Sequence, residues 1–510
     1  MKNAMKFKGL FMVCLALLFA VTLGAFPLFA AAKDTLTDRA LADQKTFDPF
    51  KTSDINDQKL HYQIYESLMR EERDGTLSPA LCTGYRFNDT GDEVTFTLRE
   101  GVKFHNGAVM TADDVVFSLN TAIASPFTSK MTSTMKEAVK IDDKTVKLIL
   151  KHPFLPILGC LVSSSCSIVP KEAYLANPDA FAQKPIGTGA YMLKGVKRGE
   201  KIDLEAFPDY HRGPASIKYL TERIIPDDNA ALMALESGAL DMMNPSQAYT
   251  DRDAIEANPN LVYYEAEQAC TFLIGFNNAK GVFADKRMRD AVAYALDRED
   301  LILGAVNGMA NPVEAASVPI CPQFPKNFKG LQYDTEKAKA LVKEAGYPNG
   351  VTVTMRVIGA ANYTKPAEVI QAQLRKVGID MKIEAMERGT WFDVVYAGGN
   401  FEITYYATPI SVADADFCSY GYLHSSEADG KGNNYMSVKK PELDKYLEAG
   451  RMGTDPEVRN AAYLKVCEIV RDESIYVPTY TGMRTYAAHK DLKGLYADPM
   501  MRYYVYNYSW

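Results

Sequence analysis

Two aspartates offer the most reactive chemistry in this sequence. Asp414 and Asp416 lie two residues apart, shortly after a hydrophobic segment. A pair of carboxylates is what a secreted hydrolase or a carbohydrate-active enzyme uses as general acid, base or nucleophile. Aspartates at a strand end also form turns, because their side chains bond to nearby backbone amides. We favour the turn and keep the hydrolase as the alternative function.

The sequence contains no other pattern typical of catalysis or cofactor binding. Its six histidines are scattered and form neither an H-E-x-x-H motif nor a pair at helical ligand spacing. The stretch IGTGAY at 186–191 lacks the Lys-Ser/Thr of a P-loop and the third glycine of a dinucleotide fingerprint, so we interpret it as a turn. The cysteine spacings do not match a zinc site. We expect no catalytic residue, no metal and no cofactor.

Aromatic side chains are better material for a binding site. The chain has 30 Tyr and 23 Phe, and a pocket for a small molecule joins apolar walls to a few polar groups. Several such residues lie near the ends of predicted elements. We predict ligand contacts from Tyr405, Tyr406, Thr408 and Trp391 in the second half of the chain, and from Thr52 and Ser53 near its start.

The N-terminus has the pattern of a secretory signal peptide. Lys2, Lys6 and Lys8 precede an uncharged, mostly apolar run that ends in three alanines at 30–32. We expect cleavage after about Ala32 and export to the periplasm. The run is also long enough to span a bilayer, so an uncleaved anchor is the competing interpretation. Removing residues 1–32 changes the net charge from −7 to −10, which argues against nucleic acid as a partner.

Seven cysteines remain after such cleavage, so at least one thiol would be free. Cys160 and Cys166 are close enough in sequence to form a disulfide bond, although spacing does not establish the geometry. Cys467 lies on an apolar helical face, which favours a buried thiol.

The elements that must position these residues indicate an α/β protein. A chain of 510 residues exceeds one ordinary core, so two lobes are expected. Alternating apolar residues predict strands at 351–357 and 379–383, with a helix between them that Pro366 opens and Gly378 ends. This βαβ unit implies a parallel sheet covered by helices. Two further helices are predicted, one from Thr335 to Ala345 and one that Thr111 caps.

The stretch LREGVKFHNGAVMTADDVVFSLN at 98–120 resembles the signature block of the family 5 extracellular solute-binding proteins, which supply ABC importers for peptides, nickel chelates and related solutes. Further resemblances follow in order along the mature chain. They are QIYESL at 63–68, PIGTGAYML at 185–193, FLIGFNNAKGVFADKRMRDAVAYALDREDLI from Phe272, YDTEKAKALVKEAGYPNG from Tyr333, and ADADF at 413–417. Several ordered matches are more specific than any one of them.

This resemblance implies a two-lobed periplasmic-binding-protein fold of the class II type, with a hinge between the lobes and an extra small domain in the first lobe. We expect a signal peptide at 1–32, lobe I at 33–270 with its accessory subdomain at about 66–199, lobe II at 271–483, and a return to lobe I at 484–510. The protein would act as a monomer that encloses a small solute between its lobes. Closure would then present a surface to the membrane permease of an ABC importer.

One position departs from the peptide-binding relatives. They carry an aspartate that pairs with the α-ammonium of the ligand, and Ser411 stands there when Asp414 anchors the alignment. A hydroxyl cannot neutralise an enclosed ammonium, whose desolvation costs several kcal/mol. We therefore predict that ordinary dipeptides and metal–histidine complexes bind weakly. Lys365, near the place of a carboxylate-binding arginine in peptide binders, would hold an anionic end or simply be a solvated lysine. If the alignment shifts by one residue, Asp414 or Asp416 would reach the ligand instead.

Overall fold

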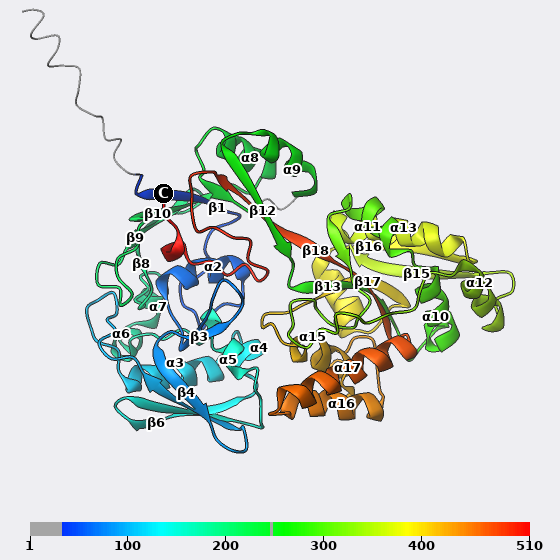
Figure 1. Ribbon diagram of the computed structural model, residues 1–510, viewed down its shortest axis with the longest axis horizontal. Helices are drawn as coiled ribbons and strands as arrows, with labels where there is room; N and C mark the ends of the chain where they lie inside the picture. Colours follow the sequence, from blue (N-terminus) through cyan, green and yellow to red (C-terminus); the bar gives the residue numbers. More distant parts are fainter. Residues whose placement is uncertain (1–32, 245–247) are drawn as a thin grey trace, which may run out of the picture.

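The computed structural model describes residues 33–244 and 248–510, so the predicted signal peptide lies outside the described residues. Two lobes lie side by side, and the N-terminal strand β1 (Thr35–Ala40) and the C-terminus belong to the same one (Figure 1). We call that lobe I and the other lobe II. Within the described ranges, no helix has the length and apolar character needed to cross a membrane.

One twelve-stranded sheet runs through both lobes, and β18 (Tyr476–His489) connects them. The first part of β18 pairs with β13 (Cys270–Phe276) of lobe II, whereas its last part pairs with β12 (Leu261–Glu267) and β11 (Met242–Met243). Lobe I completes its part of the sheet with β1, β10 (Tyr219–Ile224), β9 (Lys201–Ala206) and β8 (Tyr191–Lys197), and lobe II with β14 (Ala310–Pro312), β17 (Ile403–Pro409), β15 (Val351–Ile358) and β16 (Ile379–Met386). The lobes are therefore joined by backbone hydrogen bonds as well as by the chain.

The predicted βαβ unit is confirmed, with one correction to its helix. β15 and β16 are parallel in register from Val351↔Ile379 to Ile358↔Met386. The helix between them, α13 (Ala361–Arg375), begins five residues before Pro366, so the prediction that this proline opens it is wrong. Pro366 costs only one hydrogen bond early in the helix, and its buried ring packs on the same side as Ile370 and Leu374. Burial of that apolar face compensates for the missing bond.

A second sheet belongs to lobe I alone. Its four strands are ordered β4 (Cys82–Phe87), β5 (Glu93–Leu98), β7 (Thr145–Leu150) and β6 (Met135–Asp142), and a separate apolar core lies beneath them. The helix α3 (Ala112–Ala124) packs on β6 and β7. The predicted cap is confirmed: Thr111 accepts from the amide of Asp114, whose carboxylate accepts from the amide of Thr111.

Short helices cover both lobes. Those of lobe I are α2 (Ile55–Ile64), α4 (Ser129–Thr132), α5 (Ile157–Cys160), α6 (Lys171–Ala176), α7 (Pro178–Phe181), α8 (Asp228–Glu236) and α9 (Ala248–Ala257), together with a hairpin of β2 (Met69–Glu71) and β3 (Leu77–Pro79). Those of lobe II are α10 (Lys286–Ala295), α11 (Arg298–Val306), α12 (Thr335–Glu344), α14 (Arg388–Trp391), α15 (Asp416–Leu423), α16 (Pro441–Met452) and α17 (Pro456–Asp472). The predicted helix from Thr335 is α12, and Asp334 caps it.

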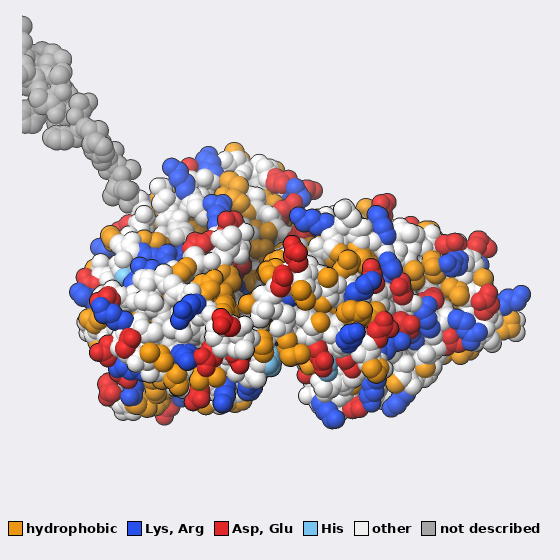
Figure 2. Space-filling model, turned by 60° about the horizontal axis from the view of Figure 1, so that its bottom comes forward, with side chains coloured by type: hydrophobic (Ala, Val, Ile, Leu, Met, Phe, Trp, Pro, Cys, Tyr) orange, Lys and Arg blue, Asp and Glu red, His pale blue; other side chains and the backbone are white. Residues whose placement is uncertain are grey.

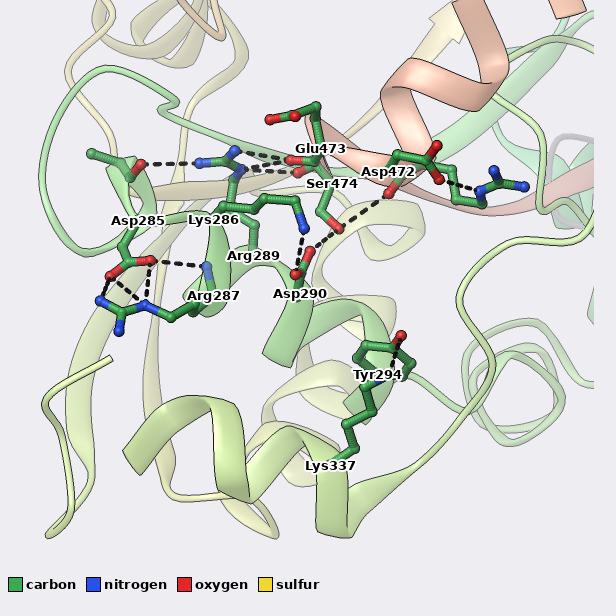
Figure 3. Close-up of polar contacts among 12 residues, drawn as sticks. Asp285, Lys286, Arg287, Arg289, Asp290, Tyr294, Lys337, Asp472, Glu473 and Ser474 are labelled. Atoms are coloured by element: carbon green, nitrogen blue, oxygen red, sulfur yellow. Dashed lines mark hydrogen bonds and ion pairs between the residues drawn. The ribbon is translucent and has the colours of Figure 1, made fainter. Parts of the chain in front are cut away.

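The long motif that begins at Phe272 is architectural (Figure 3). Asp285 caps α10 and also binds the guanidinium of Arg287. Arg289 is buried and donates to backbone oxygens of residues 283, 284, 473 and 474. It thereby ties the start of α10 to the turn that leads into β18. Asp290 reinforces the same junction, since it accepts from Ser474 at 2.7 Å.

The glycines of IGTGAY are also architectural. A Cβ atom on Gly187 would lie 2.0 Å from the backbone oxygen of Ile64, and one on Gly189 would lie 2.5 Å from that of Gln63. The ring of His105, from the 98–120 block, lies between these glycines: its Nδ1 accepts from the amide of Gly187, and its Nε2 donates to the oxygen of Gly189. Burial lowers the pKa of His105 to about 4, so the ring is neutral. These hydrogen bonds join the 98–120 block to the IGTGAY segment.

Candidate functional site

A cavity of about 480 Å³ lies between the two lobes. Figure 2 shows the constriction that separates them on one face of the molecule. Lobe I lines this interlobe cavity with the β2–β3 hairpin (residues 71–77), Gly159 and the C-terminal residues 498–500 and 502, and lobe II lines it with Ile320, Pro322, Val412 and Ala413. A volume of this size suits a small organic molecule.

The loop after β17, residues 410–415, brings the lobes into direct contact. The guanidinium of Arg502 in lobe I donates to the backbone oxygen of Ser411. Val412 packs against the apolar core beneath the four-stranded sheet of lobe I. The approach is close, since a Cβ atom on Gly159 would lie 2.4 Å from Cγ1 of Val412. Ser411 is half-buried at this contact, next to the two residues that line the interlobe cavity from lobe II.

Every carboxylate of the cavity wall already has a hydrogen-bond donor within the protein. Glu71 pairs with Arg502, and Asp498 accepts from the amides of Met500 and Arg502. Burial raises the pKa of both acids, and Arg502 acts against that rise. Glu72 accepts from Ser78, and the exposed Asp74 from Thr76. Each carboxylate of the described wall therefore accepts at least one hydrogen bond from the protein.

The aromatic residues predicted as pocket walls lie inside lobe II. Trp391 has no exposed surface, stacks on Tyr406 at 4.5 Å between ring centroids, and donates its indole N–H to the backbone oxygen of Arg356. Tyr405 is fully buried with its hydroxyl 3.2 Å from that of Thr479. Tyr406 keeps a small exposed fraction and stacks on Tyr363 at 5.9 Å. Contact of these three residues with a solute stays a prediction.

The remaining predicted contacts are dispersed. Thr408 is buried and donates to the backbone oxygen of Thr271. Thr52 is buried and donates to Asp57, whereas Ser53 next to it is exposed. Lys365 is exposed on the second turn of α13. None of these residues lines the interlobe cavity, so their roles also stay predictions.

Both aspartates of the hydrolase alternative are engaged in buried ion pairs. Asp414 receives two hydrogen bonds from Arg459, at 2.7 and 2.8 Å, and Asp416 receives two from Arg451, both at 2.8 Å. Burial raises the pKa of Asp414, and Arg459 opposes that rise. Side chains held in this way position the loop after β17 and do not present a reactive pair. Among the described residues, no cluster of His, Cys, Asp and Glu could hold a metal ion.

Comparison with known proteins identifies the family. Residues 76–430 match the model of the bacterial extracellular solute-binding proteins, family 5. The chain belongs to this family. It is a solute-binding protein of an ABC importer and not an enzyme, so the hydrolase alternative is wrong. The two-lobed fold of the family is confirmed by the solved structures that follow.

Relatives cover nearly the whole of this family 5 chain. The glutathione-binding protein GsiB of Salmonella typhi is 27% identical over 495 residues, which cover 95% of this chain and 96% of the relative. The structure of HbpA2 from Haemophilus parasuis has a TM-score of 0.84 at 25% identity, with 93% of this chain and 99% of that chain covered. The ABC transporter-associated protein DppA from Helicobacter pylori, in complex with the peptide STSA, has a TM-score of 0.77 at 26% identity, with 94% and 98% covered.

The sequence did not indicate the residues that shape the interlobe cavity. Arg502 and Glu71 are more than 400 positions apart, and neither belongs to a recognisable motif. The pairing of Asp414 with Arg459 likewise spans two helices. In the sequence, only the ADADF segment indicated the importance of the loop after β17. It did not indicate that Arg459 and Arg451 pair with the aspartates of that loop.

Proposed function

We propose that this solute-binding protein captures a small peptide-like organic compound in the interlobe cavity. The observation that carries the proposal is the cavity itself, whose walls come from both lobes and whose 480 Å³ suit a solute of that size. GsiB is named for binding glutathione, and the DppA structure holds a peptide. Both names support a peptide-like class of solute.

The polar groups of the cavity support a solute without a free ammonium. Ser411 brings no charge, and the acids of the lobe I wall are already paired with donors of the protein. An enclosed ammonium would have to share a carboxylate with its present donor, because Ser411 cannot neutralise the charge. We expect blocked or modified peptides to bind more tightly than free dipeptides.

The other parts of the transport cycle complete the proposal. Residues 1–32 direct export and are cleaved after about Ala32, and the mature protein acts as a monomer. Lobe I, with its accessory subdomain at about 66–199, and lobe II close over the solute about the hinge formed by β12 and β18. Ser411, Tyr406 and their neighbours would then meet the solute, and the closed form would dock on the membrane permease.

Native mass spectrometry of the purified protein tests this proposal. Ala413→Trp places an indole in the interlobe cavity, and we expect it to remove a small molecule that copurifies with the unmodified chain. Val458→Trp is the control, because Val458 is 52% exposed on α17 and does not line the cavity. Equal retention of the molecule by Ala413→Trp and the unmodified chain would locate the binding site elsewhere. Chemical turnover of the molecule would contradict the function itself.

A further inference from the structure

Lobe II contributes two side chains to an apolar core of lobe I. Val412, from the loop after β17, and Phe417, from α15, pack with residues of the core beneath the four-stranded sheet, which we call the accessory core. The ring of Phe417 lies 6.4 Å from that of Phe154, a buried residue of lobe I, between centroids. Val412 is itself buried. The accessory core therefore continues across the boundary between the lobes.

Val412 occupies a space that a glycine of lobe I leaves open. Gly159 is a buried residue of α5, and the three atoms nearest to a Cβ atom placed on it all belong to Val412. They are Cγ1, Cβ and Cγ2, at 2.4, 3.6 and 3.7 Å. The backbone of Gly159 is not left-handed, so the local conformation does not require a glycine. The close approach of lobe II is what requires it.

Contacts on both sides of Val412 fix its position. On one side, Arg502 of lobe I is buried and donates to the backbone oxygen of Ser411. On the other, the backbone oxygen of Val412 accepts from the amide of Asp414 at 2.8 Å, and Arg459 binds the carboxylate of Asp414. A valine side chain is also stiff about χ1. Val412 therefore leaves Gly159 mainly through movement of the whole loop.

A second close contact joins the same parts of the two lobes. A Cβ atom on Gly91, in the turn between β4 and β5, would lie 2.6 Å from Cγ2 of Thr454, in the loop between α16 and α17. Figure 1 shows α15 and α16 on the side of lobe II that faces the four-stranded sheet, away from the crossing of β12 and β18. These contacts are therefore separate from the hydrogen-bonded connection between the lobes.

We propose that Val412 and Gly159 form a latch that holds the two lobes together, so that the closed form is the major one even without a solute. Separation of the lobes exposes Val412, Phe417 and the apolar surface around Gly159 to water, and this costs free energy in proportion to the apolar area. Val412 and Gly159 also line the interlobe cavity, so the latch closes one side of it. A slower escape of the solute is a consequence that rests on the proposed function. The latch itself does not.

Gly159→Ala tests the latch from the side of lobe I. The added methyl group overlaps Cγ1 of Val412 only when the lobes are closed, so we expect the ratio of closed to open protein to fall about tenfold. Small-angle X-ray scattering should then give a larger radius of gyration than for the unmodified chain, with both proteins shown by native mass spectrometry to hold no small molecule. Gly84→Ala, in β4, is the matched control and should leave the radius unchanged, because a Cβ atom there meets no atom within 4 Å.

Val412→Ala completes a double-mutant cycle. It removes the two methyl groups that fill the space beside Gly159, so we expect this variant also to lower the ratio of closed to open protein about tenfold. Combined with Gly159→Ala, it leaves the two Cβ atoms 3.6 Å apart, which is an ordinary contact. The double variant should therefore have a smaller radius of gyration than Gly159→Ala alone. Ile320→Ala is the control and should leave the radius unchanged, because Ile320 lines the same cavity but does not belong to the accessory core.

Equal radii for Gly159→Ala and the unmodified chain would overturn the proposal, and so would a double variant as expanded as Gly159→Ala alone. Thermal unfolding shows whether each variant folds, and alanine is the better helix former at a position such as Gly159 in α5. If Gly159→Ala does not fold, the comparison of Val412→Ala with Ile320→Ala decides the question. None of these measurements uses a solute, so the proposed function can fail independently.

Discussion

The two lobes contribute different chemistry to the interlobe cavity. All six charged side chains of its wall come from lobe I, namely Glu71, Glu72, Arg73, Asp74, Asp498 and Arg502. The lobe II residues of the wall, Ile320, Pro322, Val412 and Ala413, carry no charge. Fixed polar groups on one side and apolar groups on the other suit a protein in which lobe I orients a solute and lobe II covers it. Covering by an apolar wall removes water without leaving new polar groups unpaired.

The apolar wall nevertheless depends on buried charge behind it. Asp414 and Arg459 hold the loop after β17 from the inside of lobe II, where both side chains have less than a tenth of their surface exposed. At the interlobe cavity, lobe I therefore presents charged side chains, whereas the ion pair of lobe II lies beneath the wall. The following predictions test this difference.

The largest effect is expected from breaking the ion pair behind the lobe II wall. Arg459→Ala leaves Asp414 buried without its cation, so we expect a loss of about 3 to 5 kcal/mol in the free energy of unfolding. Urea denaturation measures this loss. Lys465→Ala, which breaks the exposed pair with Glu468 on the same helix, is the control and should leave the stability unchanged. An equal free energy of unfolding for the two variants would mean that the buried pair of Asp414 and Arg459 does not stabilise the loop.

Acid should destabilise lobe I through two histidines, His61, which is fully buried, and His105, which is half-buried. Burial lowers the pKa of His61 and of His105 from 6.5 to about 4. The unfolded state therefore binds more protons between these values, so this stability is full above pH 6.5 and is lost as the pH falls toward 4. We expect a loss of about 2 kcal/mol per histidine between pH 7 and pH 5.

His105→Gln should remove the part of the pH dependence of unfolding that comes from His105. Urea titrations at pH 7 and pH 5 compare this variant with the unmodified chain and with His152→Gln, a control at a half-buried position. The control should keep the full dependence on pH. An unchanged slope in His105→Gln would show that protonation of His105 does not contribute to the dependence on pH.

A carboxylate placed on the lobe II side would give both sides of the interlobe cavity a charged group. With Ser411→Asp, we expect a free dipeptide to bind about tenfold more tightly, or about 1.4 kcal/mol, because its ammonium gains a partner. An N-acetylated dipeptide should gain nothing. Ser53→Asp adds the same charge at an exposed position of lobe I and is the control in calorimetry. Micromolar binding of free dipeptides by the unmodified chain would contradict the prediction.

The smallest effect is expected at Lys365. If its ammonium reaches an anionic end of the solute, Lys365→Ala should weaken binding of a peptide with a free carboxylate by about threefold. A peptide amide should bind the variant and the unmodified chain equally. No difference between the two peptides would leave Lys365 as a solvated lysine of α13.

Local features of the fold were predictable because the residues involved are close in sequence. The capping box of Thr111 and Asp114 spans one helical turn, and Asp334 caps α12 by accepting from the amide of Lys337, three residues later. The alternation in 351–357 and 379–383 predicted two strands, since one face of each is buried. The start of α13 was not predictable from Pro366, because burial of its apolar face outweighs one lost hydrogen bond.

The amino-acid sequence by itself determined the family and the local elements, including the aspartate-rich loop after β17. Only the tertiary structure decided how that loop is used: Asp414 binds Arg459, Asp416 binds Arg451, and Trp391 packs inside lobe II and not at the interlobe cavity. The physical reason is distance along the chain. A cap or an amphipathic face is specified by neighbours three or four residues away, whereas a buried ion pair or a cavity wall depends on segments that only the folded chain brings together.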